Sequence, residues 1–340
     1  MRGIIRQSNG VYIVDSGYSG QPRVAAVYFV IDHGRVAIVD TGSNASVPHI
    51  LSALACLDVR PEAVEWVIPT HLHLDHAGGV GSLMCALPRA HAVIHPSAAN
   101  HLAHPARIWE KALKVFGAEQ SFRLYGRLIP VDEHRIVPSH NGMELPLGDR
   151  VLKILDTPGH ARHHIVAWDE SAGVFFAGDA FGISYREFDV GRRSFVFPSS
   201  SPAQFDPVAM MGSISRMLTY NPQAMYLAHY GKVTGVERLA NDLFRLIHAQ
   251  VAIAQAARGS GLKRHIEILS SLEELVREER ARQQWALNEE ISLNLLRPDL
   301  CLNAQGLEMW LDHLHEKQLI EEAEMVMREE KAGLAEAVAA

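Results

Sequence analysis

Residues 70–76, with the sequence THLHLDH, directly follow the apolar run 64–69. Three imidazoles and one carboxylate therefore lie within positions 71–76. Neutral imidazole and carboxylate are the usual protein ligands for zinc, iron and manganese. Few structural roles require four such groups in so short a segment, so the segment predicts a metal site.

The spacing within this segment predicts two metal ions. His71 and His73 are two positions apart, so at the end of a strand their side chains can point in one direction. Asp75 and His76 are adjacent and therefore diverge. The glycine-rich residues 77–81 allow the backbone to turn closely behind them. We expect one ion at the first pair and a second ion at the other pair.

Further candidate ligands follow other strand-like runs. His160 lies in the segment DTPGH at 156–160, after the run 151–155. Asp179 follows the run 173–176, and His229 follows the run 225–228. The ends of neighbouring strands can meet at one edge of a sheet. We therefore expect these side chains to meet the histidine-rich segment in space.

With these motifs the chain resembles the metallo-β-lactamase-fold superfamily of metallohydrolases, in its glyoxalase II and lactonase branch. The resemblance rests on HLHLDH at 71–76, TPGH at 157–160, GD at 178–179, the late His229 and an early VDTG at 39–42. The motifs occur in the family order across residues 10–235. The resemblance implies an α+β fold, a four-layer αββα sandwich.

The family pattern also implies a role for each ligand. His71, His73 and His160 would hold one divalent ion, while Asp75, His76 and His229 would hold the other. Asp179 would bridge the two ions, for which zinc is the first expectation and iron or manganese the alternatives. Asp40 either orients a ligand or is a turn aspartate that accepts backbone N–H groups.

Elements can be placed coarsely along the chain. We expect strands at 11–14, 24–31, 35–40, 64–69 and 91–95, and helices at 46–57 and 78–86. These belong to a catalytic domain over 1–235, which a helical insertion interrupts at about 97–127. Helices at 236–259, 265–281 and 305–331 form a helical C-terminal region over 236–340.

Two irregular segments are candidates for substrate contact: the insertion, and the long loop 181–202. In that loop, Tyr185, Arg186, Arg192 and Arg193 either contact an anionic substrate or pair with neighbouring acids on the surface. Tyr230, beside His229, either donates a hydrogen bond to the substrate or packs in the core. His101 and His104 are expected to form a solvated helix face.

Composition and charge limit the classes of function. The chain has a net charge of −7, and residues 262–340 hold 9 of its 32 basic and 17 of its 39 acidic side chains. An acidic tail repels phosphate backbones, so we expect no nucleic-acid partner. The N-terminus has no long apolar segment and the run 24–31 is too short to span a bilayer, which favours a cytoplasmic protein without a membrane partner.

Cysteine and the apolar tail residues give two further expectations. Cys56, Cys85 and Cys301 form no CxxC pair, so a thiolate zinc site is not expected. The first two lie in apolar helical patterns, which predicts inert core residues.

The tail also carries an apolar face, which we expect to dock on the core or on the second subunit of a homodimer. It consists of Leu307, Trp310, Leu311, Leu314 and Leu319.

The function implied by the resemblance is metal-dependent hydrolysis of a small-molecule substrate. A hydroxide bridging the binuclear site would attack an ester, thioester or lactone bond, with Asp75 orienting it and accepting its proton. The alternatives are a phosphodiesterase or nuclease of the same fold, and a mononuclear-iron persulfide dioxygenase. The complete set of seven ligands favours hydrolysis.

Overall fold

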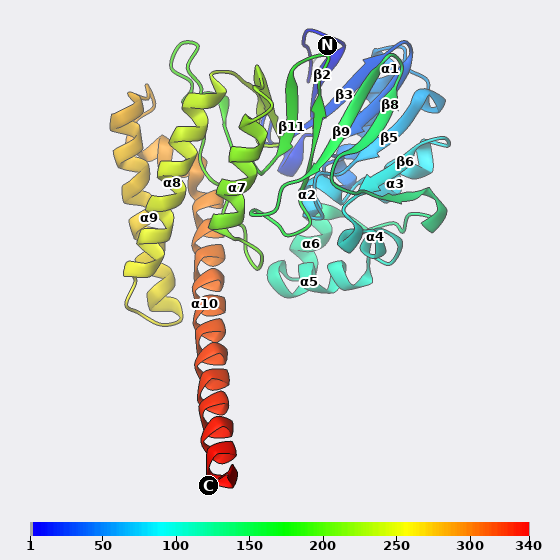
Figure 1. The fold of residues 1–340 in the computed structure, drawn as a ribbon. Helices are drawn as coiled ribbons and strands as arrows, with labels where there is room; N and C mark the ends of the chain where they lie inside the picture. Colours follow the sequence, from blue (N-terminus) through cyan, green and yellow to red (C-terminus); the bar gives the residue numbers. More distant parts are fainter. Residues whose placement is uncertain (1–2, 340) are drawn as a thin grey trace.

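The computed structural model describes the backbone of residues 3–339, and the side chains of these residues except 115–116 and 317–339. Two β-sheets pack face to face, and helices cover both outer faces (Figure 1). This arrangement is the predicted four-layer αββα sandwich. The apolar residues between the sheets come from both of them.

The first sheet holds strands in sequence order. They are β1 Ile4–Arg6, β2 Val11–Asp15, β3 Ala26–Asp32, β4 Arg35–Val39, β5 Val64–Ile68, β6 His91–Ile94 and β7 Ile136–Pro138. The second sheet has the order β13-β12-β11-β10-β9-β8. Its strands are β8 Met143–Leu147, β9 Arg150–Asp156, β10 Ile165–Asp169, β11 Val174–Gly178, β12 Ala224–Leu227 and β13 Gly231–Val233.

Strand β11 shows how the residue pattern builds the layers. Successive side chains of a strand point to opposite faces. Phe176 accordingly lies in the core between the sheets, while Phe175 and Ala177 lie in the core under the outer helices. A strand that is apolar at every position, as this one is, therefore becomes a central strand buried on both faces.

A tight hairpin joins β3 and β4. Asp32 and Arg35 are paired across the two strands, so His33 and Gly34 form the loop. Both loop residues have positive φ, 46° and 75°. Such a pair matches the right-handed twist of the flanking strands, and glycine adopts it without a steric cost.

Helices of the first two-thirds of the chain cover the sheets and form the insertion. They are α1 Val47–Cys56, α2 Leu74–Ala77, α3 Val80–Ala86, α4 Pro96–Ala103, α5 Ala106–Phe116, α6 Ala118–Tyr125 and α7 Pro207–Leu218. Helices α4, α5 and α6 lie between β6 and β7 in the sequence, and they form the predicted helical insertion. Cys56 and Cys85 are exposed, which corrects the expectation that they are core residues. Their helices turn other apolar side chains, such as Leu54 and Met84, to the core.

The C-terminal region is helical, as predicted, and packs on the outer face of the second sheet. It consists of α8 Val236–Ala256, α9 Leu262–Gln283 and α10 Glu289–Ala339. The last helix was expected to begin at residue 305, but it begins sixteen positions earlier, at Glu289. The reason is that Pro298 lies inside α10 without ending it. Beyond the body of the protein α10 continues alone (Figure 1).

The expected apolar face of the tail docks on the core. Leu307 and Leu311 are buried in the core formed with the second sheet, and Trp310 packs against it. Leu314 is half-buried, and the side chain of Leu319 lies outside the described residues. Among the described residues, no helix combines the length and the apolar character needed to cross a membrane.

Candidate metal centre

The strand ends bring the first set of donors together. Nε2 of His71 lies 2.8 Å from Nδ1 of His73, and Nε2 of His160 lies 3.1 Å from the same atom. Oδ2 of Asp179 is 3.2 Å from Nε2 of His160. Each of the four side chains offers a donor atom, and these atoms lie within 4.8 Å of one another.

A second set lies on the short helix α2 and after β12. Oδ2 of Asp75 is 3.3 Å from Nε2 of His76 and 3.4 Å from Nε2 of His229. The two imidazole nitrogens are themselves 3.3 Å apart. His71 and His73 therefore belong to the first donor set, and Asp75 and His76 belong to the second. This is the pairing that their spacing predicted.

Asp179 lies between the two sets. Its Oδ2 is 3.6 Å from Nε2 of His76, and its Oδ1 is 3.8 Å from Nε2 of His229. Oδ1 is buried and has no hydrogen-bond partner. A buried carboxylate oxygen without a partner is costly unless a cation satisfies it. The donor atoms therefore fit a metal centre in which this carboxylate is shared.

Hydrogen bonds from outside the donor sets orient the rings. The backbone N–H and the hydroxyl of Thr70 donate to Oδ1 of Asp40 at 2.7 and 2.9 Å, and Oδ2 of Asp40 lies 3.3 Å from Nδ1 of His76. Asp40 was expected either to orient a ligand or to accept a backbone N–H group, and it does both. Nδ1 of His229 lies 2.8 Å from the carbonyl oxygen of Val24, so Nε2 is left for a metal.

The sequence HARHH at 160–164 contains two further histidines that sequence reasoning missed. Nε2 of His164 accepts the backbone N–H of Asp179 at 3.2 Å, and Nε2 of His163 accepts that of Leu72 at 3.1 Å. Both rings thereby hold the backbone of ligand segments. Their closeness to His160 in sequence was the available signal.

Gly178 permits the close packing before Asp179. Its φ is 50°, and a Cβ at this position would lie 2.6 Å from Nε2 of His164 and 2.8 Å from Oγ1 of Thr70. A larger residue would therefore push the supporting ring away from the carboxylate's backbone.

Electrostatics at the centre favour positive charge. Burial, together with the neighbouring His160, lowers the pKa of His73 to about 3. Burial also opposes charge on His229, but the carboxylates of Asp179 and Asp75 raise its pKa to about 9. Against the effect of burial, His76 and His160 lower the pKa of Asp179 to about 2. A metal ion would replace the proton that the carboxylates favour on His229.

A rim of uncharged and acidic groups surrounds the donors. Tyr18 and Tyr125 share a hydrogen bond through their side chains, and the charge of Asp75 acts on both phenols. The hydroxyl of Ser201 lies 3.3 Å from Nε2 of His73. Asp75 is the most exposed carboxylate of the donors, with a side chain 22% exposed against 4% for Asp179. Solvent therefore reaches the centre on the Asp75 side.

The insertion and the long loop, the two segments expected to be candidates for substrate contact, both reach this rim. Tyr125 ends α6, and its carbonyl oxygen accepts a hydrogen bond from Asn44. The loop 181–202 contributes Tyr185 and Ser201, and the carbonyl oxygen of Ser199 lies 2.9 Å from Nδ1 of His160.

Tyr230 is buried between the sheets, 3% exposed, and belongs to their shared core. Burial raises the pKa of its phenol to about 12, and the strongest charges acting on it are those of Asp15, Arg23 and Arg186. The structure therefore favours core packing over the catalytic role predicted for Tyr230. Both residues lie in the turn after β12, and the phenol of Tyr230 packs in the core between the sheets, so its closeness to His229 in sequence does not bring its hydroxyl to the donors.

The arginines of the loop are engaged elsewhere. Arg186 donates to the carbonyl oxygens of Ser184 and Lys232 and pairs with Asp189 at 3.4 Å. Arg193 is exposed and donates to the carbonyl oxygen of Gln283. Of the two roles expected as alternatives, Arg186 therefore shows the pairing with a neighbouring acid, and Arg193 also holds the loop to its surroundings. Arg192 is exposed on the surface.

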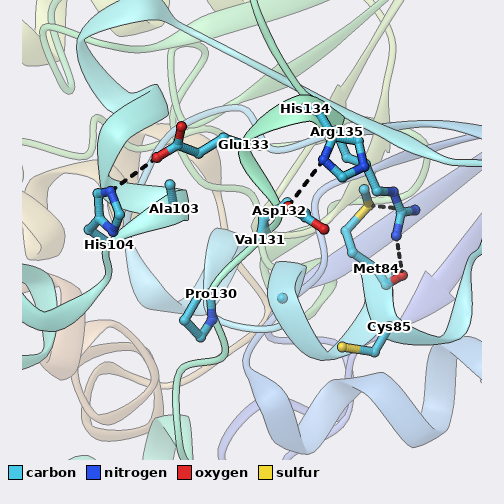
Figure 2. A pocket seen from close by; sticks show the side chains of 11 residues that line it. Met84, Cys85, Ala103, His104, Pro130, Val131, Asp132, Glu133, His134 and Arg135 are labelled. Atoms are coloured by element: carbon cyan, nitrogen blue, oxygen red, sulfur yellow. Dashed lines mark hydrogen bonds and ion pairs between the residues drawn. The ribbon is translucent and has the colours of Figure 1, made fainter.

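A separate hollow of about 950 Å³ lies between α3, α4 and the segment before β7 (Figure 2). His104 pairs with Glu133 at its edge at 3.2 Å, as expected for a polar surface histidine, and Arg135 donates to the carbonyl oxygen of Met84. None of the seven donor residues lines it. The hollow is distinct from the metal centre.

Similarity to known proteins agrees with the geometry. Residues 20–229 match the family model of the metallo-beta-lactamase superfamily. The chain is 25% identical over 229 residues to the metallo-beta-lactamase fold-containing protein ST1585 of Sulfurisphaera tokodaii, covering 66% of this chain and 80% of that protein. It is 26% identical over 159 residues to a hydroxyacylglutathione hydrolase of Aeromonas salmonicida, covering 45% of each.

Solved structures show the same fold. That of ST1585 from Sulfolobus tokodaii has a TM-score of 0.63 at 20% identity and covers 88% of this chain and 99% of its own. That of the family protein TTHA1429 from Thermus thermophilus has a TM-score of 0.58 at 21% identity, covering 79% and 94%. With its family match, its two-sheet sandwich and its clustered histidines and aspartates, this chain belongs to the metallo-beta-lactamase superfamily.

Proposed function

We propose that this protein is a hydrolase that uses a binuclear metal centre to cleave an ester, thioester or lactone bond in a small-molecule substrate. The observation that carries the proposal is the position of Asp179, whose carboxylate lies within 4 Å of imidazole nitrogens of both donor sets. His71, His73 and His160 would hold one ion, Asp75, His76 and His229 the other, and Asp179 both. Zinc is our first expectation, because imidazole and carboxylate suit it.

Two divalent ions, when bound, supply an activated water and polarise a carbonyl oxygen. The chain itself contributes proton handling and orientation. Asp75, on the solvent side of the centre, is placed to orient the attacking water and accept its proton. Tyr18 and Tyr125 cover the same side and limit the access of bulk water.

The surroundings of the centre support a carbonyl substrate over a phosphodiester. Among the described residues, no hydrogen bond or ion pair joins a lysine or arginine to any of the seven donor side chains. Their partners outside the set are Thr70, Asp40, Ser199, Ser201 and Val24. Nucleic-acid enzymes need basic side chains along the phosphate backbone. The match to hydroxyacylglutathione hydrolases also supports ester-type chemistry, although it spans less than half of those proteins.

Metal content and a substrate panel test this proposal together. Protein purified without added metal is analysed for zinc, iron and manganese, and then assayed on esters, thioesters, lactones and phosphodiesters. We expect about two ions per chain and turnover of one carbonyl class. A single iron with oxygen uptake on a persulfide, and no hydrolysis, would overturn the proposal in favour of a dioxygenase.

A pair of histidine variants provides the control. His73→Ala removes a ring from the first donor set and should abolish turnover. His104→Ala removes a surface ring that pairs with Glu133 and should leave metal content and turnover unchanged. Equal effects of the two substitutions would contradict the assignment of the centre.

A further inference from the structure

The C-terminal helix α10 contributes a carboxylate to the rim of the metal centre. The hydroxyl of Tyr185 donates to Asp299, with its oxygen 3.1 and 3.3 Å from the two carboxylate oxygens. Tyr185 lies in the loop that follows Asp179, so this contact joins residues 114 positions apart in sequence. Both side chains are half-buried and remain partly open to solvent.

The pair lies beside the donor residues: the backbone N–H of Ser184, the residue before Tyr185, donates to the carbonyl oxygen of His229, and Asn303, one helical turn after Asp299, accepts the backbone N–H of Ser200. The charges of Asp179 and Asp75 both act on the phenol of Tyr185, and those of His229 and Asp179 act on the carboxyl of Asp299. Burial raises the pKa of Asp299 to about 6, so the group is ionised at pH 8. A bound substrate therefore meets a negative charge and a phenol hydroxyl on this side.

Among the described residues, no lysine or arginine contacts the pair, and His229, whose charge acts on Asp299, would be neutral as a metal ligand. Arg186, the residue after Tyr185, turns its guanidinium to Ser184 and Asp189 instead. An anionic substituent brought next to Asp299 would meet like charge in a partly desolvated place. A hydroxyl or amide N–H at the same place would donate to the carboxylate.

We propose that Asp299 and Tyr185 form a specificity wall that accepts substrates with an uncharged hydrogen-bond donor and rejects those with a carboxylate at that position. This inference rests on the proposed function and names its substrate class: neutral, hydroxyl- or amide-bearing acyl compounds. The helical C-terminal region is then part of the active site. The competing explanation is that the contact only docks α10 on the loop.

Binding of two matched thiols separates these explanations without requiring turnover. The probes are 4-mercaptobutan-1-ol and 4-mercaptobutyrate, which differ in a terminal hydroxyl or carboxylate. Each is titrated at pH 8 into the Co²⁺-substituted protein, and the visible absorption of the cobalt reports binding. The quantity of interest is the ratio of the two Kd values.

Asp299→Asn removes the charge with little change of shape, and should shift that ratio at least about tenfold in favour of the carboxylate probe. Asp299→Glu keeps the negative charge and should therefore retain the preference for the hydroxyl probe. Asp312→Asn is the matched control, since it removes a carboxylate of α10 that pairs with Arg264 on the surface, and the ratio should not change.

A lower Tm of Asp299→Asn with an unchanged Kd ratio would overturn the specificity wall and leave only docking. If this variant does not fold, Tyr185→Phe serves instead, because it keeps the carboxylate. In Tyr185→Phe, the ratio of the two Kd values should stay within about threefold of that of the unmodified protein. Loss of the preference for the hydroxyl probe in this variant would overturn the role of the charge. If the probes bind with the predicted ratios but no ester, thioester or lactone is hydrolysed, the proposed function fails and the wall stands.

Discussion

Substitution of Asp40 by asparagine tests how the centre is oriented from outside. Asp40 is 2% exposed and joins the backbone of Thr70 to Nδ1 of His76. Its φ is 59°, a left-handed conformation that asparagine tolerates well among non-glycine residues. Asp40→Asn therefore keeps the turn and changes only the hydrogen-bonding group that faces the ring.

The expected effect follows from the direction of that hydrogen bond. The carboxylate accepts from Nδ1–H of His76 and leaves the lone pair of Nε2 for a metal. An asparagine whose carbonyl oxygen still accepts from Thr70 directs its NH₂ group at Nδ1. This favours the tautomer with the proton on Nε2, the donor atom of the second set. Loss of such a partner costs about 10- to 100-fold in metal affinity, or about 1.4–2.7 kcal/mol.

Chelator competition with Zn²⁺, fitted to two sites, measures this effect. One of the two Kd values should rise by that factor while the other changes little, because His76 of the second set is the donor that Asp40 contacts. Asp32→Asn is the control: Asp32 also accepts a backbone N–H, from Asp149 at 2.7 Å, but lies on the β3–β4 hairpin. Two unchanged Kd values in Asp40→Asn, or an equal loss at both sites, would refute the reasoning.

Three other perturbations have defined outcomes. Asp179→Ala should leave the fold intact by circular dichroism. It should lower the metal content from about two ions to about one or fewer and abolish turnover. Full activity in that variant would refute the shared carboxylate. Phe176→Ala should reduce the free energy of unfolding in urea by about 3–5 kcal/mol, because its ring is fully buried 5.2 Å from that of Tyr226; a loss below about 1 kcal/mol would contradict the packing. Removal of metal with EDTA should lower the Tm by several degrees, since ions at a hundred times their Kd stabilise the folded state by about 2.7 kcal/mol, and an unchanged Tm in calorimetry would contradict a structural contribution.

The local part of the centre was readable in the sequence. The segment 70–76 carries four donors within one loop, so their types and spacing are visible without a fold. The other donors follow strands, and strand ends are recognisable from apolar runs. Sequence reasoning therefore predicted the donor residues that the structure brings together, as well as the αββα layers and the helical insertion.

Where sequence reasoning failed, a local pattern did not determine the direction of a side chain. Cys85 lies in an apolar helix yet is exposed, because a helix buries only one face. Tyr230 is adjacent to a ligand yet lies in the core between the sheets.

The sequence by itself determined the fold class, the family and the identity of the donors, because each depends on residue type and on order along the chain. Only the tertiary structure decided what surrounds the donors. Asp299 meets Tyr185 because α10 packs on the loop, and Tyr18 meets Tyr125 because the insertion folds back on the N-terminal strands. Such contacts join residues a hundred or more positions apart, and they depend on the packing of whole layers, which no local pattern records.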